Sequence, residues 1–178
     1  MIINQIINSE KIFLKTLNPK NVTSKYIEWL NDFEVNKFLE TRHSHQDINT
    51  VKEFVAKKNY SKDELLLGIF TRLGNNHIGN IKLGPIKTEH LLAEISIFIG
   101  DKNSWGKGYA SESINSLKEF AFNALGLRKL TASMYETNKG SIAAFKKADF
   151  EIEALIPDHY LLNNKEENIV IMGAKLKN

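Results

Sequence analysis

The segment 104–111, "SWGKGYAS", sets two glycines around a lysine. It follows an apolar run, "EISIFIG", and precedes a long helical pattern. Glycine lets the backbone approach a bulky group, and the free N–H groups at a helix start can bind a phosphate. Lys107 adds a positive charge. The segment therefore indicates a pyrophosphate-binding turn, with a plain strand–helix connection as the alternative.

Two well-known phosphate motifs do not fit this segment. A P-loop requires G-x-x-x-x-G-K followed by Ser or Thr. Gly100 lies one residue too far from Gly106, and Gly108 stands where Ser or Thr is needed. A dinucleotide-binding turn requires a third glycine, where this chain has Ser111.

The elements that must position this turn follow from hydrophobic periodicity and capping residues. Asp47 and Asn138 are the expected N-caps of two of the helices. We expect strands at 11–17, 64–72, 77–86, 91–100 and 128–135, and helices within 18–32, 47–59, 110–125 and 138–150. Two last strands, near 150–156 and 168–176, flank a loop at 161–166 and are expected to form a hairpin. This order predicts a mixed α/β fold around one sheet.

Composition restricts the class of protein. The chain has 178 residues, a formal net charge of +3 and no cysteine. The absence of cysteine excludes disulfides, thiolate metal sites and a cysteine nucleophile. The small net charge does not call for nucleic acid, and no segment has the apolar length that a membrane span needs. The N-terminus lacks the pattern of a secretory signal. We expect one cytoplasmic domain over residues 1–178, with neither a nucleic-acid nor a membrane partner.

The segment "AEISIFIGDKNSWGKGYASESI" resembles the acetyl-CoA-binding core of the GNAT acetyltransferase superfamily. In that family a strand with an acidic residue leads into a [QR]-x-x-G-x-[GA] turn and then a helix. Gly108 and Ala110 match this turn, and Trp105 stands where Gln or Arg is usual. The form "WGKGYA" followed by Ser-Glu is similar to the branch that contains ribosomal-protein alanine N-acetyltransferases and many bacterial small-amine and amino-sugar acetyltransferases.

A second block, "YETNKGSIAAFKKADF", resembles the N-x-x-S-x-x-x-x-x-K-x-G-F segment of that branch. Asn138, Ser141, Lys147 and Phe150 match, and Asp149 replaces the glycine. Residues 26–39 are similar to the N-terminal helices of the branch. The resemblance covers nearly the whole chain and implies a single, mostly antiparallel sheet flanked by helices.

The resemblance implies direct transfer of an acetyl group from acetyl-CoA to a primary amine, without a metal. An alkyl amine has a pKa of about 10 and must lose its proton to attack, so the enzyme needs a base. Glu94 is the leading candidate, because it matches the acidic position of the family strand. Alternation puts Glu94, Ser96 and Phe98 on one strand face. The alternative for Glu94 is an exposed edge charge or a salt bridge.

The resemblance also implies the cosubstrate contacts. Main-chain groups of Phe98 and Ile99 are expected to pair with the pantetheine arm. Asn138 is expected to contact the same arm, and Phe145 and Lys147 are expected nearby. The general acid is Ser141, Tyr135 or water, because Phe145 stands where many members have a tyrosine. The pyrophosphate is expected on the N–H groups of Trp105, Gly106, Lys107, Gly108, Tyr109, Ala110 and Ser111.

Three functional hypotheses therefore remain at this point. The first is an N-acetyltransferase, a monomer or homodimer, acting on an amino sugar, polyamine, amino acid or protein N-terminus. The second is a non-catalytic acetyl-CoA sensor, and the third is a nucleotide-binding module of another class. His43, His45 and Asp47 form only a weak metal pattern, and Arg42 could face an anionic acceptor.

Overall fold

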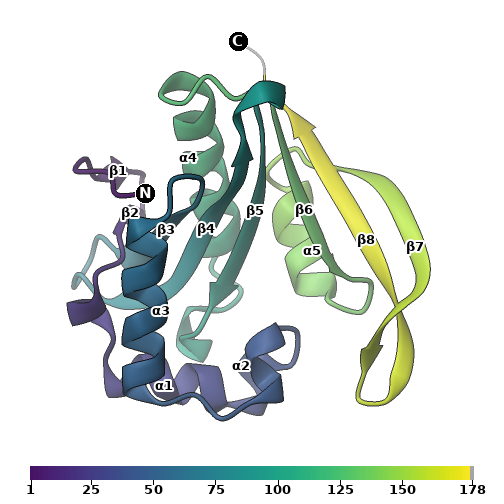
Figure 1. The fold of residues 1–178 in the computed structure, drawn as a ribbon, viewed down its shortest axis with the longest axis horizontal. Coiled ribbons are helices and arrows are strands. Elements are labelled where there is room, and N and C mark those ends of the chain that lie inside the picture. Colours follow the sequence, from purple (N-terminus) through teal and green to yellow (C-terminus); the bar gives the residue numbers. More distant parts are fainter. Residues whose placement is uncertain (177–178) are drawn as a thin grey trace.

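The computed structural model describes residues 1–176 and contains one eight-stranded sheet (Figure 1). The strand order is β1-β2-β3-β4-β5-β6-β8-β7. Neighbouring strands are antiparallel except β5 and β6, which are parallel. The strands are β1 (Ile7–Asn8), β2 (Ile12–Thr16), β3 (Leu65–Thr71), β4 (His77–Lys87), β5 (Leu92–Ile99), β6 (Lys129–Tyr135), β7 (Glu151–Leu162) and β8 (Lys165–Lys175). The predicted class, a mostly antiparallel sheet flanked by helices, is confirmed.

Helices cover both faces of this sheet. On the first face, α4 (Tyr109–Asn123) and α5 (Lys139–Lys146) bury Ile114, Leu117 and Phe145 in the larger core. We call this the α4–α5 face. On the second, the α1–α3 face, Trp29 and Val55 pack over Leu66 in a smaller core. The helices of that face are α1 (Ser24–Asn31), α2 (Phe33–Asn36) and α3 (Ile48–Tyr60).

Strand β3 shows why one stretch of sequence is apolar without alternation. All seven of its residues are buried, because it lies in the middle of the sheet with a core on each face. A strand covered on both faces carries a continuous apolar run rather than an alternating one. The continuous apolar run "LLLGIF" in the sequence therefore reflects the burial of β3 on both faces of the sheet.

The predicted caps form hydrogen bonds at the helix starts. The Asp47 carboxylate accepts from the N–H groups of Asn49 and Thr50 at 2.8 and 3.1 Å, and the Asn138 side chain accepts from the Ser141 N–H at 3.2 Å. Such caps satisfy N–H groups that have no partner within the helix. They fix where α3 and α5 begin.

The final hairpin is longer than expected. Strands β7 and β8 extend through most of the predicted loop 161–166 and leave a two-residue turn, Asn163–Asn164. Both asparagines have positive φ, 53° and 61°, as a type I′ turn requires. Asparagine tolerates this conformation, so the "NN" pair closes a tight hairpin rather than a loop. The short strand β1 was not anticipated.

Candidate active site

Strands β5 and β6 separate part-way along their length. Within residues 1–176, their registered pairing covers Leu92 with Lys129, Ala93 with Leu130, and Glu94 with Thr131. Beyond Glu94 the two strands diverge toward the end of the sheet where α2 lies (Figure 1). We call this opening the β5–β6 split. Strand β5 therefore exposes an unpaired backbone edge along the split.

The direction of the main-chain groups along this edge follows from one hydrogen bond. The Gly100 N–H donates to the Ile78 carbonyl of β4 at 2.9 Å. Because successive residues of a strand point their groups to opposite neighbours, those of Phe98 point toward β4, whereas those of Ile97 and Ile99 point into the split. Phe98 lies in register with Asn80 of β4. The expectation that Phe98 presents main-chain groups at the split is therefore corrected in favour of Ile97.

Glu94 lies at the apex of the split, in the last registered pair of β5 and β6. Its side chain is exposed and the following Ile95 is buried, so the two residues lie on opposite strand faces, as alternation predicted. Phe98, on the same side of the strand, stacks on Tyr26 of α1 with ring centroids 6.1 Å apart. Glu94 therefore faces outward on the α1–α3 face, beside the unpaired edge of β5.

The glycine turn lies directly after β5 and leads into α4. Gly106 and Gly108 have φ of 73° and 83°, a region that glycine enters at little cost. A Cβ atom at Gly106 would meet nothing within 4 Å, so the space beside it is open. Helix α4 begins at Tyr109. Lys107 is exposed beside the turn.

The first turn of α4 presents N–H groups that a helix cannot satisfy internally. Tyr109, Ala110 and Ser111 occupy this first turn, and the Ser111 hydroxyl donates to the Gly108 carbonyl at 2.9 Å. With the positive φ at Gly108, this arrangement suits an anionic group at the helix start.

The second block that resembles the family includes α5. Asn138 and Ser141 are half-buried at the start of this helix. Phe145 is only 2% exposed and packs edge-on against Phe150, with ring centroids 5.0 Å apart. The Phe145 ring therefore belongs to the core and not to the surface of the split, which corrects its expected place beside the cosubstrate. Lys147 is exposed at the end of α5.

The backbone conformation at residue 149 explains why aspartate can stand where the family has a glycine. Asp149 has φ of 61°, the left-handed region in which glycine is the usual residue. Aspartate tolerates this region better than most residues. The Lys118 ammonium lies 3.0 Å from the Asp149 carboxylate and donates to the Ala148 carbonyl at 2.7 Å.

A polar cluster spans the wide end of the split. The Tyr135 hydroxyl donates to Glu40 Oε1 at 2.9 Å and accepts from Arg42 Nη2 at 2.9 Å. Arg42 Nη1 lies 3.1 Å from the same Glu40 oxygen. Partial desolvation raises the pKa of Glu40, but hydrogen bonds from Tyr135 and Arg42 outweigh it and hold that pKa below its usual range. Burial, with the bond to Glu40, raises the pKa of Tyr135.

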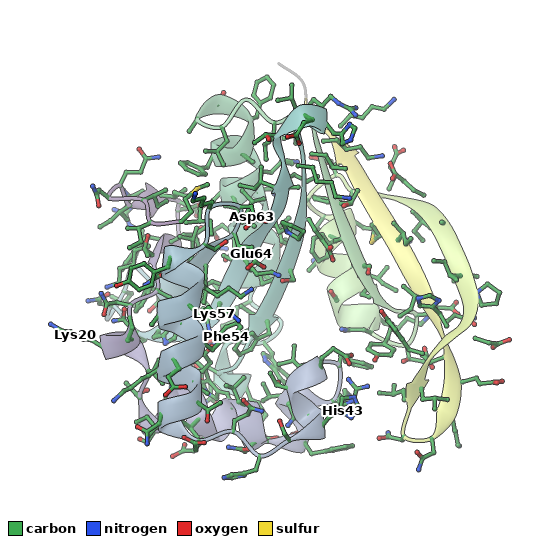
Figure 2. All side chains as sticks on the ribbon, viewed as in Figure 1. Lys20, His43, Phe54, Lys57, Asp63 and Glu64 are labelled. Carbon is green, nitrogen blue, oxygen red and sulfur yellow. The ribbon has the colours of Figure 1, made fainter. Side chains whose placement is uncertain are left out.

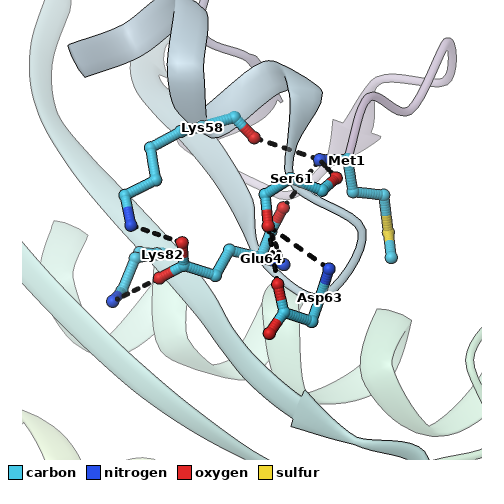
Figure 3. A network of polar contacts seen from close by, with 6 residues as sticks. All are labelled: Met1, Lys58, Ser61, Asp63, Glu64 and Lys82. Atoms are coloured by element: carbon cyan, nitrogen blue, oxygen red, sulfur yellow. Dashed lines mark hydrogen bonds and ion pairs between the residues drawn. The ribbon is translucent and has the colours of Figure 1, made fainter.

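A second charged cluster lies on the α1–α3 face (Figure 3). The Glu64 carboxylate pairs with Lys58 of α3 and, at 3.2 Å, with Lys82 of β4. Burial raises the pKa of Glu64, but these two lysines outweigh it and lower the pKa overall. Lys82 is in register with Ser96 of β5. Figure 2 shows Glu64 beside the upper part of α3, near the strands of the sheet. Sequence reasoning missed this cluster.

The histidine-rich loop is not assembled as a metal site. Asp47 is engaged in capping α3, and His43 Nε2 lies 3.5 Å from Glu40 Oε2. Among the described residues 1–176, no group of three or more His, Cys, Asp or Glu side chains could hold a metal ion. The helices in this part of the chain are all too short or too polar to cross a membrane.

A cleft of about 630 Å³ lies on the other side of the glycine turn from the split. It is lined by residues of the β2 start and the β3–β4 turn together with Lys107 and Tyr109. The lining includes Lys11, Lys25 and Arg72 as well as Glu10 and Asp101. The cleft shares the turn with the site but not Glu94.

Comparison with known proteins defines the class. Residues 11–151 match the family model described as an acetyltransferase (GNAT) domain. This match covers well over half of the chain, and the chain therefore belongs to the GNAT acetyltransferase family. It is an acetyl-CoA-dependent N-acetyltransferase, with acetyl-CoA as its cosubstrate.

Relatives and solved structures agree with this assignment. An uncharacterized N-acetyltransferase, YoaA of Bacillus subtilis (strain 168), is 27% identical over 161 residues, 89% of each chain. Another, p20 of Bacillus licheniformis, is 34% identical over 82 residues, only 46% of each chain. A spermidine N-acetyltransferase from Vibrio cholerae, solved with CoA and spermine, has the same fold at 19% identity, with a TM-score of 0.83 over 94% of this chain and 97% of that one.

A structure of a ribosomal-protein-serine acetyltransferase from Vibrio cholerae, assigned provisionally by name, also shares the fold. It is 15% identical, with a TM-score of 0.77 over 98% of this chain and 99% of that one. At such identities the likeness concerns the fold alone. The expected ribosomal-protein branch therefore remains a hypothesis.

Proposed function

We propose that this enzyme acetylates the primary amine of a small molecule, with Glu94 as the base that removes the amine proton, directly or through water. The observation that carries the proposal is the place of Glu94. Its exposed carboxylate lies in the last β5–β6 pair, where the backbone edge of β5 becomes free. A base must lie within hydrogen-bond reach of the proton it takes, so it must stand beside the cosubstrate.

The cosubstrate fits the features that surround Glu94. The pantetheine arm carries amide groups, and the edge of β5 at Ile97 and Ile99 offers main-chain groups that can pair with them as an added strand would. The pyrophosphate then falls at the start of α4, where Gly106 leaves open space. Both parts of acetyl-CoA thus have a matching surface along one continuous segment.

The chemistry needs one base and one acid. The neutral amine nitrogen attacks the thioester carbon, the C–S bond breaks, and the CoA sulfur leaves as a thiolate that takes up a proton. Tyr135 is poorly suited as the acid, because its hydroxyl proton goes to Glu40 and its pKa is raised. Ser141, at the start of α5, or a water molecule beside it, remains the proton donor that we propose, and Asn138 contacts the cosubstrate arm.

The acceptor class rests on the open surface above Glu94. Ser96 and Glu94 are both exposed on the α1–α3 face, which leaves room for a small amine. The Vibrio cholerae enzyme of the same fold acts on spermidine, by its name. We therefore place polyamines in the acceptor panel with amino sugars, amino acids and N-terminal peptides.

The test is thiol release from acetyl-CoA with this panel. The chain has no cysteine, so a thiol reagent reports free CoA without background from the protein. Glu94→Gln should lower kcat by about 100-fold or more at near-neutral pH. The matched control is Glu89→Gln, an exposed glutamate of the short 3-10 segment Thr88–His90. Retention of kcat in Glu94→Gln would exclude Glu94 as the base. Acetyl-CoA binding without turnover of any amine would favour the sensor hypothesis.

A further inference from the structure

The wide end of the β5–β6 split is spanned by side chains rather than by strand pairing. Segment 38–43 follows α2 and includes the 3-10 segment Glu40–His43. Tyr135 is the last residue of β6, 93 residues beyond Arg42. Figure 2 places His43 at this end of the molecule, below the diverging strands. The bonds between the two segments therefore determine how segment 38–43 lies over the opening.

Arg42 makes most of these bonds. Its Nη2 donates to the Tyr135 hydroxyl at 2.9 Å and to the Leu161 carbonyl of β7 at 3.4 Å. Its Nη1 donates to Glu40 Oε1 and to the Leu39 carbonyl, at 3.1 and 3.0 Å. The Arg42 side chain is only 10% exposed. The guanidinium thus joins its own segment to both β6 and β7, which a lysine ammonium cannot reproduce.

Aromatic packing surrounds the same point. The Tyr135 ring lies 5.9 Å from the ring of Phe38, in segment 38–43, and 5.9 Å from the ring of Tyr160, on β7. The Arg42 guanidinium carbon lies 5.3 Å from the Tyr135 ring centroid. Tyr135 is 5% exposed, and its hydroxyl is hydrogen-bonded to Arg42 and Glu40. Loss of either partner would leave a buried polar group without one of its hydrogen bonds, which costs folding free energy.

The cluster lies on the same face of the sheet as Glu94. Leu130, Ala132 and Met134 of β6 belong to the core of the α4–α5 face. The alternate residues Thr131, Ser133 and Tyr135 therefore face the α1–α3 side. Thr131 is paired with Glu94, and Tyr135 is four residues further along β6, roughly 13 Å away. An amine that approaches the exposed Glu94 from the wide end of the split passes segment 38–43.

We propose that Arg42 and Tyr135 form a latch that holds segment 38–43 across the acceptor entrance, so that Arg42 is a positioning residue for the amine. The proposal rests on the function proposed above, because it assumes that the amine approaches Glu94 on this face. Glu40 is 71% exposed in its side chain, and the latch sets where this carboxylate stands at the entrance.

The test uses two conservative variants of the full chain. Tyr135→Phe removes the hydroxyl but keeps the ring between Phe38 and Tyr160. Arg42→Lys keeps the positive charge but loses the planar guanidinium group, whose two terminal nitrogens bond to different partners. The matched control is Arg128→Lys, because Arg128 Nε donates to the His90 carbonyl at the other end of β6. Two readouts are measured: the KM values for acetyl-CoA and for the best amine of the panel, and hydrogen exchange of residues 37–45.

The latch predicts a selective effect on the amine. Each variant should raise the amine KM by about 5-fold or more, with less than about 2-fold change in the acetyl-CoA KM. Exchange at residues 37–45 should become faster, and the effect of the double variant should be smaller than the sum of the single effects because the two residues share the bond between Arg42 Nη2 and the Tyr135 hydroxyl. The Arg128→Lys control should change neither quantity.

Two outcomes would overturn the latch. Unchanged exchange in both variants would show that these bonds do not hold the segment. Faster exchange with an unchanged amine KM would show a purely structural contact. A wild-type enzyme that acetylates no amine would instead refute the proposed function, and exchange in the variants would then decide alone whether Arg42 and Tyr135 hold segment 38–43.

Discussion

The indole Nε1 of Trp105 donates a hydrogen bond of 2.8 Å to the main-chain carbonyl of Ile99. This bond fastens the glycine turn to the last residue of β5. It also explains why tryptophan can stand where the family pattern has Gln or Arg, because the indole supplies a donor in place of a polar side chain. The carbonyl of Ile99 is thereby occupied, which leaves its N–H and the groups of Ile97 for the split.

Trp105→Phe tests this fastening. Phenylalanine keeps an aromatic ring at a side chain that is 42% exposed but removes the donor. We expect the turn to loosen and the KM for acetyl-CoA to rise by about 3- to 10-fold, the effect of one lost hydrogen bond. Steady-state kinetics with varied acetyl-CoA measure it. An unchanged KM would mean that the turn holds its shape without the indole.

Gly106→Ala tests whether the open space beside the turn receives the cosubstrate. Gly126→Ala is a matched control, because Gly126 has φ of 64° and, like Gly106, no atom within 4 Å of an added Cβ. Both substitutions carry the same backbone strain, about 1–2 kcal/mol. Both should therefore lower the melting temperature similarly, but only Gly106→Ala should weaken acetyl-CoA binding in calorimetry. Equal binding by the two variants would contradict the assignment.

His77 should make stability depend on pH. Burial lowers its pKa below the ordinary 6.5, although a contact of 2.9 Å between Nε2 and Asn80 Oδ1 opposes this. Below about pH 6.5 the unfolded chain protonates this histidine while the folded protein does not, so stability falls as the pH decreases.

The measurement for His77 is the melting temperature between pH 5 and 8. The variant His77→Gln should be less stable at pH 7, where it loses stacking on Phe70 at 4.9 Å, but should show a shallower decline toward acid. The control His90→Gln changes an exposed histidine and should keep the wild-type slope. Parallel curves for wild type and His77→Gln would refute the role of His77.

Glu112 links the first turn of α4 to the start of β2. Its Oε1 accepts from the N–H groups of Lys11 and Ile12 at 2.7 and 3.3 Å. Glu112→Ala leaves these donors without their partner and should cost about 1–3 kcal/mol of folding free energy. Urea denaturation measures it, with the exposed Glu119→Ala of the same helix as control. Equal midpoints for the two variants would show that solvent replaces the carboxylate.

The sequence predicted those parts of the fold and site that depend on local order. Alternation placed Glu94 on one strand face with Phe98, opposite Ile95, and the caps at Asp47 and Asn138 set the starts of two helices. These outcomes need only the period of a strand and the unsatisfied N–H groups of a helix.

Features that depend on pairing between distant segments were not predictable. The end of β5–β6 pairing at Glu94, and with it the free edge at Ile97, depends on a register that no single segment encodes. The contact of Arg42 with Tyr135 joins residues 93 positions apart. The burial of Phe145 follows from which side of α5 meets the sheet, which the short helix did not reveal.

The separation of β5 from β6 has a thermodynamic consequence. Among residues 1–176, only three registered residue pairs join these two strands and so connect β1–β5 to β6–β8 within the sheet. A ligand whose amide groups hydrogen-bond to the strand edges in the split acts as an added strand and links the two parts of the sheet. Its binding to the folded state then increases the free energy of unfolding by an amount that grows with ligand concentration. The melting temperature of this enzyme should therefore rise with the concentration of acetyl-CoA and report its occupancy.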